Sequence, residues 1–200
     1  MLTTRLRFIE PQLASSVDQP PEGKHWIHEI KHDGYRSQVL VERGQARVFT
    51  RNGYDWSDRY PSIVRAAANL RCQSAIIDGE AIVQNGNGAS DFEALSSAMR
   101  RQPHSIILYA FDLLHLDGKD LRQQTLIGAS SQLERLCLEQ MTEAAFSLAM
   151  SLMAMVMPCS KPALSRNLKA SSPNMHWHPI DLVAAGLGSR PSASPNRPLW

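Results

Sequence analysis

Apolar and polar residues alternate along the first part of the chain, and the period of this alternation predicts its elements. Residues 35–43, YRSQVLVER, alternate with a period of two, and the run ARVFT follows after a turn at Gly44. A period of two is typical of a strand with one buried face, so we expect two antiparallel strands joined by this turn. Residues 24–32 also mix apolar and polar side chains and predict a further strand.

Two segments have helical spacing instead. Residues 57–70, SDRYPSIVRAAANL, place helix formers behind a Ser/Asp cap, and residues 90–101, SDFEALSSAMRR, place apolar side chains on one helical face. Residues 75–83, AIIDGEAIV, and 105–118, SIILYAFDLLHLDG, are apolar runs that end near glycine turns and predict buried strands. The expected fold class for residues 1–127 is therefore α+β, with a mainly antiparallel sheet and flanking helices.

Residues 128–200 have a different composition. They contain six of the eight Met and seven of the twelve Pro, but no Tyr and only four of the nineteen acidic residues. The stretch AMSLMAMVM has no clear period, and the final SRPSASPNRPLW is typical of a disordered tail. The Ala/Met-rich composition near 138–157 is compatible with an amphipathic helix, but its pattern differs from that of the first part of the chain. We therefore predict a domain over residues 1–127 and a poorly ordered tail over 128–200.

Composition narrows the class of protein without identifying it. The chain has 200 residues, of which 43% are hydrophobic and 20% charged, which suits one globular domain or one domain with an appendage. A net charge of +2 permits a nucleic-acid partner but does not require one. Cys72, Cys137 and Cys159 have no metal-binding or disulfide-framework spacing. Because no leader and no long apolar segment is visible, we expect a cytoplasmic protein without a membrane partner.

The candidate chemistry begins at HEIKHDGYR, where Lys31 stands two residues before the pair Asp33-Gly34. An ordinary lysine, with a pKa of about 10.4, is a poor nucleophile unless burial or neighbouring cations favour its neutral form. A half-buried strand supplies such burial. The string alone is equally compatible with a solvent-exposed charge at a strand edge, followed by a tight turn.

Three further strings stand at predicted strand ends: TRNG at 50–53, IIDGE at 76–80 and YAFD at 109–112. With them, the sequence resembles the covalent nucleotidyltransferases, and most closely the ligase domain of bacterial ATP-dependent DNA ligases used in non-homologous end joining. The resemblance runs from about residue 8 to residue 127. It includes, in order, FIEPQLA, HEIKHDGYR, TRNGYDW, IIDGEAIV, FEALSSAM and YAFDLLHLDGKDLR. It implies the nucleotidyltransferase fold of DNA ligase adenylation domains, which is ATP-grasp-like.

The resemblance also implies a reaction. Lys31 would attack the α-phosphate of ATP and form lysyl-AMP, with Mg²⁺ or Mn²⁺ balancing the phosphate charge. Arg36 would bind the ribose, and Arg51 would contact the ribose or a DNA phosphate. The AMP would then pass to the 5′-phosphate of nicked or broken double-stranded DNA, and the strand would be sealed. Bacterial end-joining repair proteins and a nucleoid location are implied as well.

The remaining implied residues belong to the same nucleotide site. Glu80 would hold a ribose hydroxyl or a divalent metal, Phe111 would stack on adenine, and Glu29 would recognise the adenine edge. The other motif positions support this site: Asp33, Gly34, Asp78 and Gly79.

Two other functions remain open. RNA ligases and mRNA capping enzymes share the lysine chemistry, although DWSDRYPSI and FDLLHLDG favour the DNA-repair branch. A non-catalytic remnant that binds nucleotide or DNA belongs to a different class. Descent from a ligase and present activity are thus separate hypotheses.

The tail lacks two motifs that the family carries next, a strand similar to E-G-I-V-S-K and a later W-x-K-x-K. In the frame that joins the last base of each codon to the first two bases of the next, LKASSPN at 168–174 can encode E-G-I-V-S-K. The segment after it can encode the second motif in the same frame. IGAS at 127–130 can arise from I-E-R-K by loss of one base. We therefore hypothesise a single-base deletion or a sequencing error at codon 128, with ligase activity impaired in the chain as written.

Resequencing the gene across codon 128 tests this hypothesis. We expect a lost base, and codons downstream that spell both missing motifs in the shifted frame. An intact reading frame whose codons cannot encode those motifs would contradict it.

Overall fold

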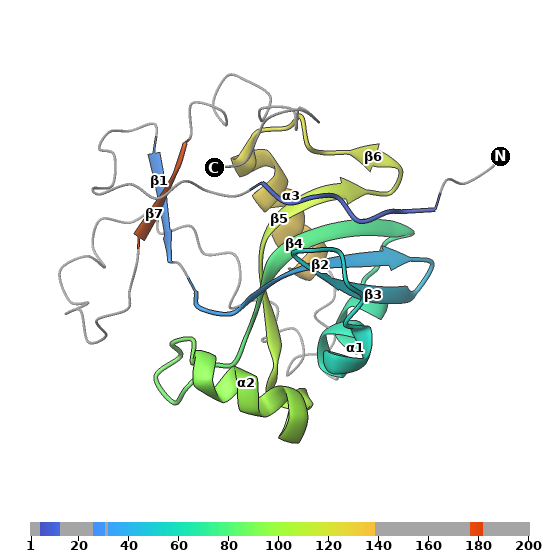
Figure 1. Cartoon of the computed structure of the whole chain (residues 1–200). Helices are drawn as coiled ribbons and strands as arrows, with labels where there is room; N and C mark the ends of the chain where they lie inside the picture. The colour runs from blue at the N-terminus through green and yellow to red at the C-terminus, as the bar shows by residue number, and fades with distance from the viewer. Residues whose placement is uncertain (1–4, 13–25, 31, 139–176, 182–200) are drawn as a thin grey trace.

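The structure is a computed structural model of the 200-residue chain, and it describes residues 5–12, 26–30, 32–138 and 177–181 (Figure 1). The strands in chain order are β1 (Trp26–Ile30), β2 (Tyr35–Glu42), β3 (Gln45–Thr50), β4 (Ser74–Ile82), β5 (Ile107–Leu116), β6 (Lys119–Asp120) and β7 (Trp177–Asp181). The helices are α1 (Pro61–Ala68), α2 (Phe92–Arg101) and α3 (Leu126–Leu138), with short 3₁₀ turns η1 (Ser57–Arg59) and η2 (Pro103–Ser105).

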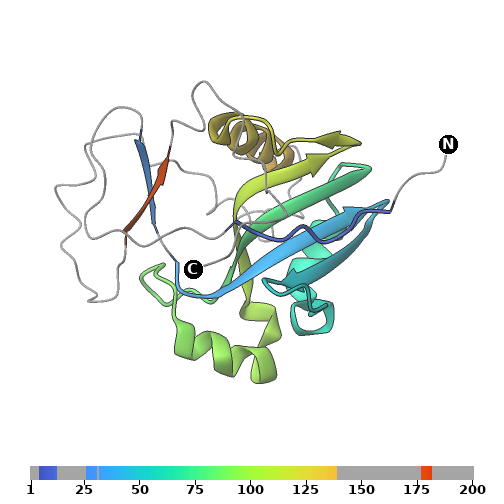
Figure 2. The ribbon, with the colours of Figure 1, turned by 45° about the horizontal axis from the view of Figure 1, so that its top comes forward.

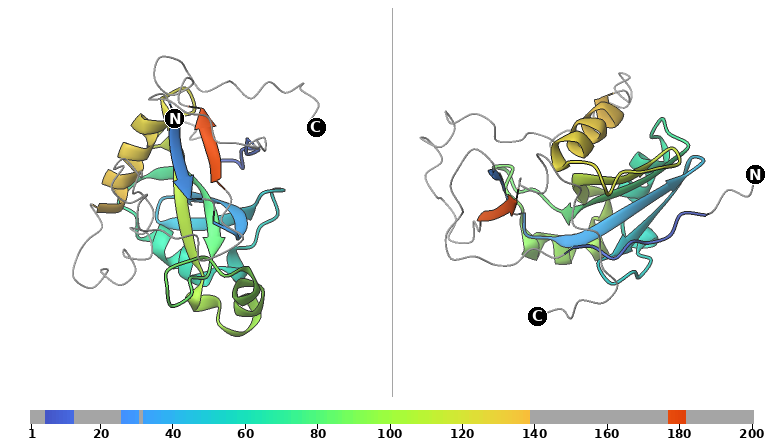
Figure 3. Two further views of the ribbon diagram at one scale, coloured as in Figure 1. Left: turned by 90° about the vertical axis from the view of Figure 1, so that its left-hand side faces the viewer. Right: turned by 90° about the horizontal axis from the view of Figure 1, so that it is seen from above.

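A five-stranded antiparallel sheet is the centre of the fold, with strand order β3-β2-β4-β5-β6. The strands lie side by side and twist across the molecule (Figures 1 and 2). A second, two-stranded antiparallel sheet pairs β1 with β7, so that Glu29 is opposite His178 (Figure 3, left). The expected antiparallel α+β architecture is confirmed, including the strands over 35–43, 75–83 and 105–118 and the two helices.

One face of the central sheet carries the main hydrophobic core. Val39 and Val41 of β2, Ile77 of β4 and Leu113 of β5 are almost completely buried on this face. Side chains from α1, α2 and α3 join the same cluster, including Ile63, Leu95 and Leu133. Every second side chain of β2 lies on this face, under the helices, but the burial of β2 does not alternate, because residues 37–41 are all buried.

The opposite face is covered at one end by residues 5–12, which we call the N-terminal strap. Leu6 and Ile9 of the strap pack against a small cluster formed by Leu40, Ile76 and Leu114. The strap and α3 lie on opposite sides of the sheet (Figure 2; Figure 3, right). The strap thus gives β2 and β4 a second buried face, which explains why their apolar runs are nearly continuous.

Gln38, only 2% exposed, attaches the strap to β2. The Ile9 N–H donates to Gln38 Oε1 at 2.8 Å, and Gln38 Nε2 donates to the Ile9 carbonyl at 2.9 Å. The Leu6 N–H donates to Glu42 Oε1 at 2.8 Å. The Gln38 amide thereby forms the two hydrogen bonds that the Ile9 backbone would otherwise make with a neighbouring strand. The polar groups of both residues are satisfied.

Helix α3 crosses the predicted domain boundary. It begins at Leu126 and ends at Leu138, and it buries Ala129, Leu133 and Leu136, which lie at helical spacing, against the core. The start of the predicted tail is therefore helical and packed, while the boundary itself stays a prediction. The Ala/Met-rich segment 138–157 lies, apart from its first residue, outside the described residues. No described helix is long and apolar enough to span a bilayer.

Gly53, in the TRNG string, has a backbone conformation that few other residues adopt. Its φ is +78°, and a Cβ atom there would lie 3.2 Å from Cδ1 of Phe8 in the strap. The Phe8 ring also lies 6.2 Å from the ring of Phe49 in β3. The strap therefore packs directly on the turn that carries Arg51.

We expect Gly53→Ala to lower the free energy of unfolding by about 1–2 kcal/mol, because a side chain disfavours positive φ and crowds Phe8. Urea denaturation measures this change. Gly88→Ala has the same φ of +78° with nothing near the new methyl group, so it isolates the backbone cost. Gly86→Ala, also in open space, should change stability little. An equal loss of stability in Gly53→Ala and Gly88→Ala would disprove the role given to the strap contact.

Candidate nucleotide site

Beyond the end of the strap, the same face of the sheet carries polar and aromatic side chains. Arg36 of β2 is directly opposite Glu80 of β4, and Glu80 is directly opposite Tyr109 of β5. Residues directly opposite one another in an antiparallel pair have side chains on the same face, so these three lie in a row. The segments that supply them are far apart in the sequence.

An irregularity between β4 and β5 adds residues to this row. Asp78 is opposite Asp112, but Gly79 is opposite Ala110, which leaves Phe111 as an extra residue on β5. Such a β-bulge changes the side-chain alternation of one strand relative to its neighbour. As a result, Tyr109 and Asp112 can both share the face of Asp78 and Glu80, although they are three positions apart.

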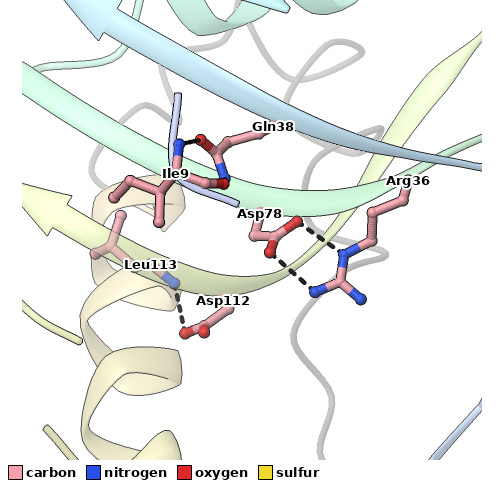
Figure 4. A network of polar contacts seen from close by, with 6 residues as sticks. All are labelled: Ile9, Arg36, Gln38, Asp78, Asp112 and Leu113. Atoms are coloured by element: carbon pink, nitrogen blue, oxygen red, sulfur yellow. Dashed lines mark hydrogen bonds and ion pairs between the residues drawn. The ribbon is translucent and has the colours of Figure 1, made fainter. Parts of the chain in front are cut away.

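Arg36 and Asp78 form a bidentate ion pair at the centre of this site (Figure 4). Arg36 Nε donates to Asp78 Oδ1 at 3.0 Å, and Arg36 Nη2 donates to Asp78 Oδ2 at 2.9 Å. The same guanidinium lies over the Phe111 ring, 4.7 Å from its centroid, as in cation–π contacts. The Asp78 side chain is almost buried, whereas about a quarter of the Arg36 side chain is accessible.

The charge balance around Arg36 is negative. Burial alone would lower the pKa of Arg36, but the hydrogen-bonded Asp78 carboxylate and the charges of Glu80 and Asp112 raise that pKa above its ordinary value. Asp112 Oδ1 also accepts the Leu113 N–H at 2.8 Å. Arg36 is therefore a fixed cation with carboxylates on several sides, and it does not exchange its proton near neutral pH.

The segment that follows Lys31 is attached to this site, although Lys31 itself lies outside the described residues. The His32 ring packs on the Tyr109 ring at a centroid distance of 4.1 Å and an angle of 44°. The Asp33 N–H donates to Ser90 Oγ at 3.0 Å. The ring contact places the residue next to Lys31 against Tyr109, near the start of β5.

The pairs Asp33-Gly34 and Asp78-Gly79 have a common explanation, close approach of neighbouring backbones. A Cβ atom on Gly34 would collide with the Ala81 carbonyl oxygen, and one on Gly79 would lie 2.6 Å from the Tyr109 carbonyl oxygen. Gly34 does not have a positive φ, so the tight turn that Asp33-Gly34 suggested is instead a bend leading into β2. Only a hydrogen atom fits between these strands at either position.

The structure brings together Arg36, Glu80 and Phe111 from the predicted site residues. Arg51 is exposed nearby, and its N–H donates to the Arg36 carbonyl oxygen at 3.0 Å. Glu29 lies in β1, outside the part of the chain whose side chains are described. The predictions for Glu29 and Lys31 therefore stay predictions.

Sequence reasoning missed three residues of the site: His32, Tyr109 and Asp112. Tyr109 is two residues before Phe111 and so shares its face in a regular strand, a signal that the sequence contained. The place of Asp112 depends on the bulge, which an uninterrupted apolar run does not indicate. The role of His32 could not be predicted because its ring contacts Tyr109, which is distant in the sequence.

Within the described ranges, no three His, Cys, Asp or Glu side chains are grouped as a metal site would require. Glu80, the predicted metal ligand, lies beside Asp78, whose carboxylate is already bound by Arg36. The carboxylate oxygens here are too few to complete the coordination of a divalent ion by themselves. Such an ion would also need oxygen ligands from a bound phosphate chain.

Comparison with known proteins identifies related sequences. The family model described as "ATP dependent DNA ligase domain" matches residues 11–155, and so continues past residue 127. The multifunctional non-homologous end joining protein LigD of Pseudomonas aeruginosa is 43% identical over 130 residues. That match covers 64% of this chain but 15% of the relative, so the chain spans a small part of that protein. The prophage-derived DNA ligase-like protein LigB of Bacillus subtilis is 27% identical, with 66% and 48% covered.

Solved structures agree on the fold. The ligase domain of Mycobacterium tuberculosis LigD is 32% identical and superposes with a TM-score of 0.52, covering 57% of this chain and 38% of that one. A mycobacterial DNA ligase D complexed with ATP is 31% identical, with a TM-score of 0.50 and coverage of 56% and 37%. The five-stranded antiparallel sheet with flanking helices is thus the predicted nucleotidyltransferase architecture, which is confirmed.

The His32–Tyr109 contact gives a pH-dependent prediction. Burial lowers the pKa of His32 below its ordinary 6.5, against an opposing effect of the Asp33 charge. In the unfolded chain His32 takes up a proton near pH 6.5, whereas in the folded chain it does so only at lower pH. The free energy of unfolding therefore decreases as the pH falls below 6.5. We expect His32→Phe, which keeps a ring on Tyr109, to gain stability relative to the wild-type chain between pH 7 and pH 5.

Urea denaturation at the two pH values measures the difference. His104, exposed in η2, supplies the matched control, and His104→Gln should show no comparable gain. A pH-independent difference between His32→Phe and the wild-type chain would contradict the prediction.

Proposed function

The chain belongs to the family of the ATP dependent DNA ligase domain, and from this premise we propose that it performs the adenylation step of a DNA ligase. The observation that carries the proposal is the meeting of Arg36, Glu80 and Phe111 on one face of the sheet, beside the segment that follows Lys31. A guanidinium, a carboxylate and an aromatic ring suit the phosphate, ribose and base of a nucleotide.

The proposed step forms one bond and breaks one. Nζ of Lys31, in its neutral form, attacks the α-phosphorus of ATP, and the bond from that phosphorus to the pyrophosphate oxygen breaks. The lysine proton leaves to solvent, and the product is a lysyl-AMP phosphoramidate. Glu80 is the residue that would hold Mg²⁺ or Mn²⁺ here, and such an ion would offset charge on the leaving pyrophosphate.

The surrounding residues would bind and orient the nucleotide. We propose that Arg36 donates to the ribose, that Phe111 stacks on adenine, and that Glu80 accepts from a ribose hydroxyl or holds the metal. Arg36 covers one face of the Phe111 ring, so a base stacking on this ring uses the other face. Glu29 would contact the adenine edge.

The later steps extend to DNA. AMP would pass from Lys31 to the 5′-phosphate of nicked or broken double-stranded DNA, and attack by the 3′-hydroxyl would seal the strand and release AMP. Exposed Arg51, next to the site, suits a DNA phosphate. Proteins of bacterial end joining at the nucleoid would be the partners. RNA ligase or capping chemistry, and a remnant that binds without reacting, are the alternatives.

Radiolabelled ATP tests the adenylation step. We expect the full chain with Mg²⁺ to acquire acid-labile label from α-labelled ATP, none in Lys31→Ala, and undiminished label in Lys119→Ala, an exposed lysine of β6 that serves as control. If the reading frame is broken near codon 128, we expect a low yield of label and nick sealing at background. The reason is that the chain lacks the W-x-K-x-K motif, whose two lysines would neutralise the triphosphate by the family resemblance.

The other outcomes separate the alternatives. Preferential label from GTP would favour capping chemistry. ATP binding without a covalent adduct would favour the non-catalytic remnant. Efficient nick sealing would disprove the frame hypothesis while supporting the ligase proposal.

A further inference from the structure

We propose that Asp78 is a positioning residue for nucleotide binding, whose carboxylate holds the Arg36 guanidinium over Phe111 so that Nη1 is presented to the ribose. This inference rests on the proposed function. It assigns a role to Asp78 of the IIDGE string, for which the sequence predicted no individual role beyond its place in the motif.

The geometry of the ion pair determines which donors Arg36 can offer. Asp78 binds the edge of the guanidinium formed by Nε and Nη2. The third nitrogen, Nη1, takes no part in this fork and points away from Asp78 (Figure 4). A fork of two parallel hydrogen bonds fixes the plane of the guanidinium as well as its position. The contact with Phe111, 4.7 Å from the guanidinium carbon to the ring centroid, is a second contact of the same group.

Burial makes this fork different from an exposed ion pair. Asp78 is 3% exposed, and a buried carboxylate is costly unless its charge is compensated. Asp112, its neighbour on β5, is also acidic. Gln38, its neighbour on β2, directs its amide to the backbone of Ile9 in the strap. Arg36 therefore supplies the cation at this position, and the pair is held in one arrangement.

The chemistry requires a carboxylate at this position. Both Arg36 atoms in the fork are donors, so the partner must accept twice. Asparagine has nearly the same size but one accepting oxygen, and its amide nitrogen would face a second donor. Asp78→Asn should therefore leave the fold largely intact while releasing the plane of Arg36.

A purely structural role for Asp78 makes a different prediction from a positioning role. If Asp78 only stabilises the sheet, its replacement weakens binding of every nucleotide by the same factor. If Asp78 acts through Arg36 on the ribose, its replacement removes the preference for ATP over analogues that lack a ribose hydroxyl. The ratio of affinities for ATP and for its 2′-deoxy and 3′-deoxy analogues is thus the decisive readout.

The experiment titrates the full chain with ATP, 2′-deoxy-ATP and 3′-deoxy-ATP and measures each Kd. We expect the wild-type chain to prefer ATP over at least one analogue by about tenfold, the equivalent of one hydrogen bond. In Asp78→Asn the preference should fall to within about twofold, and Arg36→Ala/Asp78→Asn should bind no worse than Arg36→Ala alone.

Two further variants make the test independent of folding defects. Arg36→Lys keeps a cation beside Asp78 but cannot form the fork, so it should lose the ribose preference while its melting temperature stays near that of the wild-type chain. Asp58→Asn changes an exposed aspartate of η1 and should keep the preference. If Asp78→Asn fails to fold, an unchanged ribose preference in Arg36→Lys still overturns the inference.

The outcomes distinguish failure of this inference from failure of the proposed function. Equal weakening of ATP and both analogues in Asp78→Asn, or an unchanged preference in Arg36→Lys, overturns the role of Asp78 and leaves the adenylation proposal standing. A wild-type chain that binds ATP without any ribose preference does the same. A wild-type chain that does not bind ATP overturns both.

Discussion

The pairing of β4 with β2 on one side and with β5 on the other is the constraint on which the rest of the structure depends. In an antiparallel sheet, register decides which side chains share a face, and a slip of one residue moves every side chain to the opposite face. Such a slip of β4 would bury Glu80 beneath the helices and turn Ile77 outward. Gly34 and Gly79 contribute to this register, because a side chain at either position would force the neighbouring backbones apart.

Two kinds of environment share one face of the sheet because the strap covers only part of it. Where the strap lies, Leu40, Ile76 and Leu114 are shielded from water. Where it does not, Arg36, Glu80 and Tyr109 stand in a row and are only partly buried. Gln38 marks the transition, since its amide satisfies the strap backbone rather than the charged residues beside it. The polar site is thus bounded on one side by apolar packing.

The sequence predicted β1 to β5, the helices α1 and α2 and the antiparallel pairing, because these follow from local period and from turn residues. It did not predict α3 or β7, which lie wholly or mainly in the segment described as a poorly ordered tail. It also predicted that Arg36, Glu80 and Phe111 belong to one site, although that grouping came from a resemblance and not from spacing. The fork between Arg36 and Asp78 joins residues 42 positions apart, and only the register of β2 on β4 brings them together. The bulge at Phe111 was unpredictable for a different reason: it depends on how two strands meet, and an apolar run such as YAFDLL fits either alternation.

The attachment of the strap through Gln38 has a consequence for the order of folding. The Ile9–Gln38 hydrogen bonds close a loop of 29 residues, whereas the β2–β3 hairpin closes through a turn at Gly44 alone. Closing the longer loop costs more chain entropy. The packing that offsets this cost forms only after β2 and β4 have paired, because their pairing creates the surface that Leu6 and Ile9 cover. We therefore expect the strap to dock after β2, β3 and β4 have paired, and to detach before they separate. Detachment of the strap exposes an apolar strip on the sheet. A chain that has not finished folding, or that opens briefly, therefore presents an apolar surface that favours association with other chains.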